Sequence, residues 1–565
     1  MPRAEVGGDA MTALLDRTPT ANLTRQTGIV PSGASTESRW SRSSVIAVFA
    51  AALAAIGLII VNVASIWTNS DTSWTWLLPG QLMNGAPRAV SLVDGNRLFP
   101  DLLLSAAVRA LTSIFGLALT GQYFVVLYDL LVVGLVIIAI VKIHGRSTAA
   151  LAGVMLLLVL LAADPSTIES IRPGYHALSA ALCLLLVARR FRRYGCSYDV
   201  LELLLLAMLI ASSRFLLTVV LVPLIATDVV LRNIRAHRSW RLLIPGLAGL
   251  FGWAALNDVP NVEVIYAPTT IQRGGTITWL WDYAKSMADA PFSVVGAAAA
   301  PMHGLLIAFL LGLGLLVVVT RRFSTLSKPD RFLITLTTAS TIIGGVTLRA
   351  GGYLVGWRGY IFLFPLLMAC VCLPRLVETA MPSASLTAIV VIGAFTTVSF
   401  SALNVRAVSQ HPQHGAVQEV HQLLVDEGLV DRVGLANYWV GYATQSHYGD
   451  MPLYNVDSWV RPFFWVVNPW RLWFDERAGR LDMHRRIDYV ISSRSCDSVA
   501  PCDPEGLTPK RSEIVAVLGE PDRWVRTSQF RLAIYNQGAN SAKLLALWKH
   551  RMDLAHLPYP ATIGG

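Results

Sequence analysis

Long apolar stretches separated by short polar segments dominate the first 402 residues of the chain. The first stretch, residues 44–66, contains about 23 residues without a charge, enough to cross about 30 Å of hydrocarbon. It ends without the small-residue cleavage site of a signal peptide, so we interpret it as a retained anchor. Further apolar segments lie near residues 123–141, 149–163, 175–188, 200–213, 215–230, 242–257, 303–320, 332–348, 359–374 and 384–402. This pattern predicts a polytopic α-helical membrane protein with about 11 transmembrane helices.

Basic residues between the apolar segments predict an orientation. With the N-terminus in the cytoplasm, three arginine-rich segments at 189–193, 232–241 and 321–331 fall on the cytoplasmic side, as the positive-inside rule requires. An odd number of spans then places the C-terminal region on the other side. The predicted localisation is the bacterial inner (plasma) membrane, with a cytoplasmic N-terminus and an extracytoplasmic C-terminal domain.

The chain divides into regions of different composition. Residues 1–43 form a polar tail that is too poor in apolar residues to fold, and residues 44–402 form the transmembrane domain. Residues 403–535 mix short β-rich runs with helical spacing, which predicts an extracytoplasmic α/β domain. The remaining predicted segments are long outer loops at 67–122 and 257–301 and a C-terminal tail at 536–565, which includes an amphipathic helix at 544–550.

Composition narrows the class of protein. Hydrophobic residues make up 54% of the chain, charged residues 15%, and the mean hydropathy is +0.52, which excludes an ordinary water-soluble enzyme. The net charge of +10 resides in clusters between apolar runs, so we expect no nucleic-acid partner. Cys496 and Cys502 are spaced to close a small disulfide loop in an oxidising compartment, although two free thiols are the alternative. No Cys and His spacing is typical of a metal site.

The first outer loop contains candidate acid–base residues. Asp71 follows the first span directly, Asp94 and Arg97 come later, and Asp101 completes a Phe-Pro-Asp triplet. A carboxylate at a membrane boundary can act as a general base on an acceptor hydroxyl. The alternative is that these carboxylates only face water.

A second group of polar residues is predicted at the same outer level. Guanidinium groups there could bind a lipid-linked phosphate bidentately. The alternatives are contacts with lipid headgroups or ion pairs with nearby acids, and for the histidine a packing role. Asp129, within the second span, is costly there unless it is paired or near the edge. The phosphate-binding candidates are Arg172, His176, Arg214, Arg349 and Arg358.

This layout resembles the GT-C superfamily of membrane glycosyltransferases, which includes protein O-mannosyltransferases and aminoarabinose transferases. The resemblance rests on the anchor, the acidic first loop with Asp71, the Phe-Pro-Asp triplet ending at Asp101, and Arg358 with Tyr360 at the start of a late span. It is closest to uncharacterised bacterial members. One departure is that Thr72 and Ser73, instead of a second acid, follow Asp71.

The resemblance implies transfer of a sugar from a polyprenyl-phosphate donor to a cell-envelope glycan, lipid or protein. Tyr360, Arg97 and the outer arginines would bind the donor phosphate, and membrane lipid would surround the protein. A divalent cation is left open, because only some members use one. Two alternatives remain at this point: a transporter or flippase of a lipid or lipid-linked glycan, and a non-catalytic assembly partner.

Overall fold

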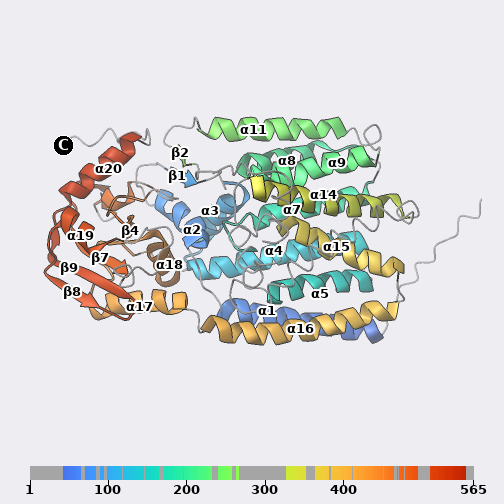
Figure 1. Ribbon diagram of the computed structural model, residues 1–565, viewed down its shortest axis with the longest axis horizontal. Helices are drawn as coiled ribbons and strands as arrows, with labels where there is room; N and C mark the ends of the chain where they lie inside the picture. The colour runs from blue at the N-terminus through green and yellow to red at the C-terminus, as the bar shows by residue number, and fades with distance from the viewer. Residues whose placement is uncertain are drawn as a thin grey trace, which may run out of the picture.

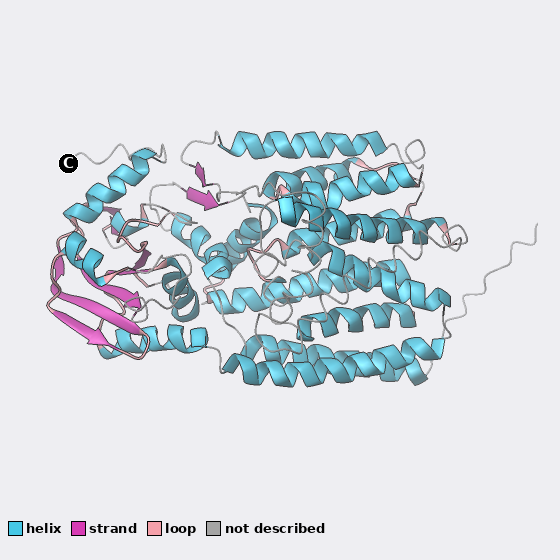
Figure 2. Cartoon of the chain, in the orientation of Figure 1, coloured by secondary structure: helices cyan, strands magenta, loops and turns pink. Residues whose placement is uncertain are grey.

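In a computed structural model, the chain forms a body of packed helices with an α/β domain at one end (Figure 1). Figure 2 shows that strands are concentrated at the end occupied by this domain. The structure describes residues 42–64, 70–83, 90–93, 98–117, 119–145, 147–163, 171–194, 196–231, 239–257, 262–265, 326–350, 363–380, 383–409, 412–449, 451–463, 468, 470–475, 478–493 and 509–554.

The helical body contains most of the apolar segments seen in the sequence. Its helices are α1 (Arg42–Ala64), α2 (Ser70–Met83), α3 (Leu103–Ile114), α4 (Gly121–His144), α5 (Thr148–Ala163), α7 (Ala177–Arg192), α8 (Val200–Ser212), α9 (Val222–Val230), α11 (Leu243–Asn257), α14 (Lys328–Ala350), α15 (Leu363–Ala380) and α16 (Ser383–Ser409). Shorter elements are the π-helices η1 (Leu98–Leu102) and η2 (Leu217–Leu221), the 3-10 helix η3 (Ser239–Leu242), and the strands β1 (Val90–Val93) and β2 (Val262–Ile265).

One continuous apolar core holds the body together. Helix α5 contributes Leu157 and Leu161, both buried, and it packs against α15, α16 and α1. Gly153 on this helix permits a close approach, because a Cβ there would lie 2.7 Å from the carbonyl oxygen of Cys370 on α15. The apolar residues of α5 are therefore used to pack helix on helix.

The prediction of about 11 transmembrane helices is wrong for the residues that the structure describes. Among them, one helix, Gly121–His144, is long and apolar enough to cross a membrane. Helices α5 and α7 have 16 residues each, α8 has 13 and α11 has 15, whereas about 20 are needed. Hydropathy located these helices but did not distinguish a span from a helix with one face in a protein core.

The predicted localisation is wrong for the same reason, because it depended on the number of membrane spans. A multi-pass protein of the bacterial inner membrane, with a cytoplasmic N-terminus and an extracytoplasmic C-terminal domain, required an odd number of about 11 crossings. The described residues contain one helix that meets the length and hydropathy requirements of a crossing. The orientation assigned from the arginine-rich segments therefore has no structural support.

The α/β domain is built on a five-stranded sheet. The strand order is β4-β3-β7-β9-β8, with β3 parallel to β4 and β7, and β9 antiparallel to β7 and β8. The strands are β3 (Gly434–Ala436), β4 (Leu453–Asn455), β7 (Ile487–Ser493), β8 (Arg523–Arg526) and β9 (Phe530–Ala539). The helices are α17 (Pro412–Asp426), α18 (Tyr438–Tyr448), α19 (Arg511–Leu518) and α20 (Ala542–Leu554), and the small elements are η7 (Arg471–Trp473), β5 (Phe474–Asp475) and β6 (Arg480–Leu481).

Alternating residues of the sheet belong to two separate cores. Leu435 and Val490 point to the core that includes α19 and α20. Ala436, Tyr489 and Ile491 point to the core that includes α17. This alternation follows from the period of two along a strand. The folded part extends beyond residue 535, since α20 contributes buried side chains to the first of these cores.

The α/β domain contacts the body through α18, which packs against α2 and α4. The Gln122 amide nitrogen lies 2.7 Å from Nε2 of His447. Strand β1 pairs in parallel with β2, so the two segments predicted as outer loops meet each other. Helix α2 therefore lies where the domain meets the body.

Candidate functional site

The Phe-Pro-Asp triplet lies inside the body, in the segment η1, whose backbone is extended at Phe99 (φ −119°, ψ 133°). The backbone N–H of Phe99 donates to Oγ of Ser212 at the end of α8, at 3.0 Å. The same element contacts α2, α3, α7 and α8. Asp101 is 2% exposed at this junction, so its carboxylate requires partners within the protein.

Two segments distant in sequence supply those partners. The hydroxyl of Tyr128 on α4 donates to Oδ1 of Asp101 at 2.7 Å, and the N–H of Gly174 donates to Oδ2 at 3.2 Å. The same tyrosine oxygen accepts the N–H of Leu178 at 3.2 Å. These two bonds join the carboxylate to α4 and to the segment just before α7, which fixes its orientation.

A second carboxylate and an arginine lie beside this pair. Asp129 follows Tyr128 on α4 and is buried, and its Oδ1 accepts no hydrogen bond from the described part of the chain. The guanidinium of Arg172 is also buried and interacts electrostatically with Asp129. We call Asp101, Tyr128, Asp129, Arg172 and Gly174 the central polar cluster. It brings two acids and one cation together inside the body.

The histidine and another predicted arginine border the central polar cluster. His176 adopts a left-handed backbone conformation (φ 64°) just before α7. Its ring packs edge-on against Phe215, with centroids 4.9 Å apart. The neighbouring Arg214 lies with its guanidinium carbon 4.4 Å from the centre of the Trp253 ring on α11. Three predicted phosphate-binding residues, Arg172, His176 and Arg214, are thus placed on segments 171–176 and 213–216.

The other predicted site residues are only partly described. Asp71 lies in the first turn of α2 and Arg349 in the last turn of α14, but in both cases only the backbone is described. The remaining candidates, Asp94, Arg97, Arg358, Tyr360, Cys496 and Cys502, lie outside the described residues. The central polar cluster therefore contains one predicted base, Asp101, and one predicted phosphate ligand, Arg172.

The sequence does not mark Tyr128, Gly174 and Ser212 as site residues. Each contacts the Phe-Pro-Asp segment across a long sequence separation, and no motif marks a lone Tyr, Gly or Ser. The sequence does mark Asp129 as an acid in an apolar helix. Because Tyr128 is the residue next to it, this acid is the sequence feature that could have indicated the tyrosine.

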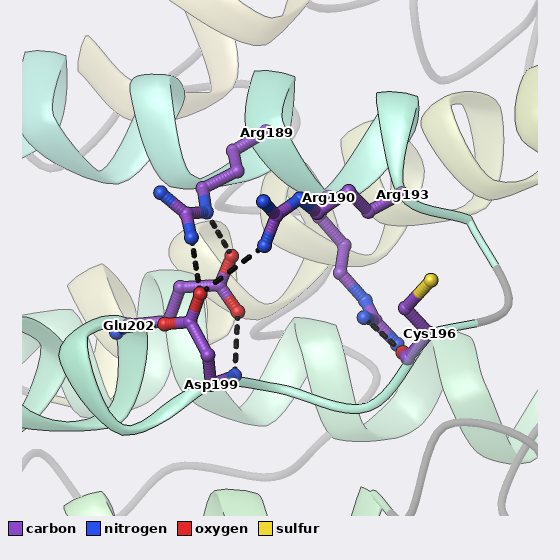
Figure 3. Close-up of polar contacts among 6 residues, drawn as sticks. All are labelled: Arg189, Arg190, Arg193, Cys196, Asp199 and Glu202. Carbon is purple, nitrogen blue, oxygen red and sulfur yellow. Dashed lines mark hydrogen bonds and ion pairs between the residues drawn. The ribbon is translucent and has the colours of Figure 1, made fainter.

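A second polar cluster joins α7 to α8 (Figure 3). Arg189 pairs with Asp199 and with Glu202, whose Oε1 lies 2.8 Å from Nε, and Arg193 lies 3.3 Å from Asp199. Asp199 caps α8 by accepting the N–H of Glu202, which accepts the N–H of Asp199 in return. Arg190 donates to the carbonyl of Cys196. These arginines, interpreted from sequence as an orientation signal, form a capping network.

Electrostatics in this capping network favour the charged carboxylate. The hydrogen bond from the Glu202 backbone, followed by the nearby Arg189 and Arg193, lowers the pKa of Asp199. Among the described residues, no group of three or more His, Cys, Asp or Glu side chains is arranged to hold a metal ion. Neither cluster therefore forms a metal centre within the described part of the chain.

Comparison with known proteins assigns no relative. No protein-family model matches the chain, and no curated protein matches it. The function is therefore inferred from the residues themselves.

Proposed function

We propose that the protein is a glycosyltransferase that transfers a sugar from a polyprenyl-phosphate donor to a glycan, lipid or protein of the cell envelope. The observation that supports this most is the position of Asp101, a buried carboxylate oriented by Tyr128 and Gly174 and close to the segment that carries Arg172. An acid held in place beside a cation is the arrangement that transfer from a sugar phosphate requires.

The proposed reaction assigns one role to each kind of side chain. Asp101 accepts the proton of the acceptor hydroxyl as its oxygen forms a bond to the anomeric carbon of the sugar. The bond between that carbon and the phosphate oxygen breaks, and the polyprenyl phosphate leaves with the bonding electrons. Arg172 and Arg214 would stabilise the negative charge of the phosphate. Tyr128 would keep the carboxylate in position.

Apolar surface next to the cluster suits an isoprenoid tail. Leu103, two residues after Asp101, is exposed on α3, as are Leu111 and Ile114 on the same helix. Phe251, on the helix that carries Trp253, is exposed as well. Exposed apolar surface of this kind marks a site of interaction rather than contact with water. A donor could thus bind with its phosphate near Arg214 and its tail along α3 or α11.

Reconstitution of the purified full-length chain with a panel of radiolabelled polyprenyl-phosphate sugars tests the proposal. We expect consumption of at least one donor, and a loss of about 10²-fold or more in Asp101→Asn, because general bases contribute that much. Arg214→Ala should chiefly raise the donor concentration needed for half-maximal rate. Asp426→Asn, on the exposed side of α17, is the matched control and should retain full activity.

The alternative base predicted from sequence is Asp71, and it is tested in the same assay. Loss of activity in Asp71→Asn with full activity in Asp101→Asn would transfer the role of base to Asp71. Full activity in both variants, or no donor consumed by the wild-type protein, would refute the proposed reaction. Unchanged far-ultraviolet circular dichroism of each variant shows that any loss is not caused by misfolding.

A further inference from the structure

A small pocket opens in the α/β domain where strand β4 ends. It encloses about 30 Å³. Its aromatic lining comes from Tyr442 on α18, Tyr454 on β4, Phe463, and Trp548 on α20, and its polar lining includes Asn455 and Arg471. Three of the strands, β4, β3 and β7, run parallel, and open α/β sheets bind their ligands beyond the carboxyl ends of such strands. Asn455 is the last residue of β4.

Neither polar atom of the Asn455 amide forms a hydrogen bond with any residue that the structure describes. Oδ1 and Nδ2 are both buried and unpaired, and the residue is 8% exposed. Gly441 on α18 makes room for this amide, since a Cβ at that position would lie 2.6 Å from Oδ1. Buried amides are almost always hydrogen-bonded. An unpaired amide in the wall of a pocket therefore points to a group that enters the pocket and supplies both a donor and an acceptor.

The buried guanidinium of Arg471 is already engaged by the protein. It donates to Oε1 of Gln445 at 2.8 Å and to the carbonyl of Met451 at 3.4 Å. Its carbon lies 5.6 Å from the centre of the Tyr454 ring. Its positive charge disfavours a cationic ligand in the pocket. The unpaired Asn455 amide and the aromatic lining favour a ligand that combines hydroxyl groups with an apolar face.

We propose that this pocket binds a neutral sugar residue of the acceptor, an inference that rests on the glycosyltransferase function proposed above. A sugar hydroxyl is both donor and acceptor, so one hydroxyl or two adjacent ones complete the Asn455 amide. The pocket is small, so it would admit a hydroxyl group rather than a whole sugar ring. The sugar ring then remains at the mouth, where its C–H face would contact Tyr454 and Phe463, the two partly exposed aromatic residues of the lining.

The position of the pocket suits an acceptor site. Asn468, which also lines it, donates its backbone N–H to Oε1 of Gln81 on α2 at 3.3 Å. Helix α2 in turn contacts η1, the element that carries Asp101. The pocket and the central polar cluster therefore lie on elements that share α2 as a neighbour.

Binding of simple sugars to the purified full-length protein tests the proposal. The probes are the methyl glycosides of glucose, galactose and mannose, titrated to millimolar concentrations and detected by saturation-transfer NMR and by the fluorescence of Trp548 and its neighbours. We expect at least one glycoside to bind, and Asn455→Ala to weaken that binding by about tenfold or more. Asn536→Ala, at an exposed asparagine of β9, should leave it unchanged.

A second variant distinguishes loss of the binding site from loss of the fold. Gly441→Ala keeps the asparagine but displaces its amide, and we expect it to weaken binding in the same way while preserving the circular dichroism spectrum. Equal binding by wild type, Asn455→Ala and Gly441→Ala would overturn the proposal, as would binding of N-acetyl amino acid amides in place of every glycoside.

The two proposals fail separately. If no glycoside binds but donor is consumed, the sugar pocket is refuted and the transferase stands. If glycoside binding depends on Asn455 while no donor is consumed in the reconstituted system, the pocket stands and the transferase reaction is refuted.

Discussion

Trp548 on α20 is the residue whose removal we expect to weaken the α/β domain most. It is 1% exposed, and its ring lies edge-on to Trp470 at 4.5 Å and to Trp473 at 6.1 Å between centroids. Replacing a buried Trp by Ala costs about 3–5 kcal/mol, because transfer energy is lost and a cavity remains. Ring pairs of this geometry account for roughly 0.5–1.5 kcal/mol of such a loss. Trp548→Ala should therefore destabilise the sheet that α20 covers.

Hydrogen exchange followed by mass spectrometry measures this effect in the full-length protein. A loss of about 3–5 kcal/mol raises the exchange rates of amides that open with the domain roughly 10²- to 10⁴-fold, since each 1.4 kcal/mol is a factor of ten. Peptides covering β7 and β9 should show the increase. Leu554→Ala is the control, because Leu554 is 62% exposed on the same helix and should change stability by about 0.5 kcal/mol or less. Equal exchange in the two variants would refute the assignment of α20 to the domain core.

Two further predictions concern the helical body. Asp199→Ala removes the capping interaction with Glu202 and should cost about 1 kcal/mol at neutral pH, seen as faster exchange of the first amides of α8. The folded-state pKa of Asp199 is lowered, so the stability it contributes is present above about pH 4 and is lost as the pH falls through the lowered value. Asp199→Asn should remove this loss of stability in acid. An unchanged dependence of stability on pH in that variant would contradict the prediction. Gly121→Leu would force a side chain into Ser446 of α18 and should lower the stability of this contact by about 1–3 kcal/mol. Faster proteolysis between domain and body would support this prediction. Unchanged proteolysis would argue against close packing there.

Helix positions could be predicted from the sequence, but their surroundings could not. The apolar segment at 123–141 corresponds to α4 at Gly121–His144, and that at 200–213 corresponds to α8 at Val200–Ser212. A run of Leu, Val and Ala has the same hydropathy against lipid as against other helices. In α5, residues such as Leu157 and Leu161 are buried in the protein core, and this use of the apolar face is a property of the tertiary structure.

Of the candidate site, the sequence predicted Asp101 but not the residues that contact it. The sequence predicts Asp101 as one of the acids in a long loop, and the Phe-Pro-Asp triplet is part of the resemblance to the GT-C superfamily. Its partners Tyr128 and Gly174 are 27 and 73 residues away, and no local pattern links them. The sequence predicts Arg172 as a phosphate ligand because the positive-inside rule disfavours arginines at the outer level. Its interaction with Asp129 depends instead on how α4 packs against α7.

The segment predicted as a long outer loop does more than connect two helices. Its helix α2 contacts η1 and α3 on one side and α18 of the α/β domain on the other. Two polar contacts hold it: Nε of Arg109 on α3 donates to the carbonyl of Trp76 at 2.6 Å, and Gln81 accepts the N–H of Asn468 at 3.3 Å. The first contact joins α2 to α3, the helix that follows Asp101 in the chain. The second joins α2 to Asn468, which lines the pocket of Asn455. Because one short helix packs against both elements, a shift of α2 on binding an acceptor would move the surroundings of the proposed base. This arrangement gives the length of the segment a physical purpose, since a minimal connection could not contact the domain and the Phe-Pro-Asp element at the same time.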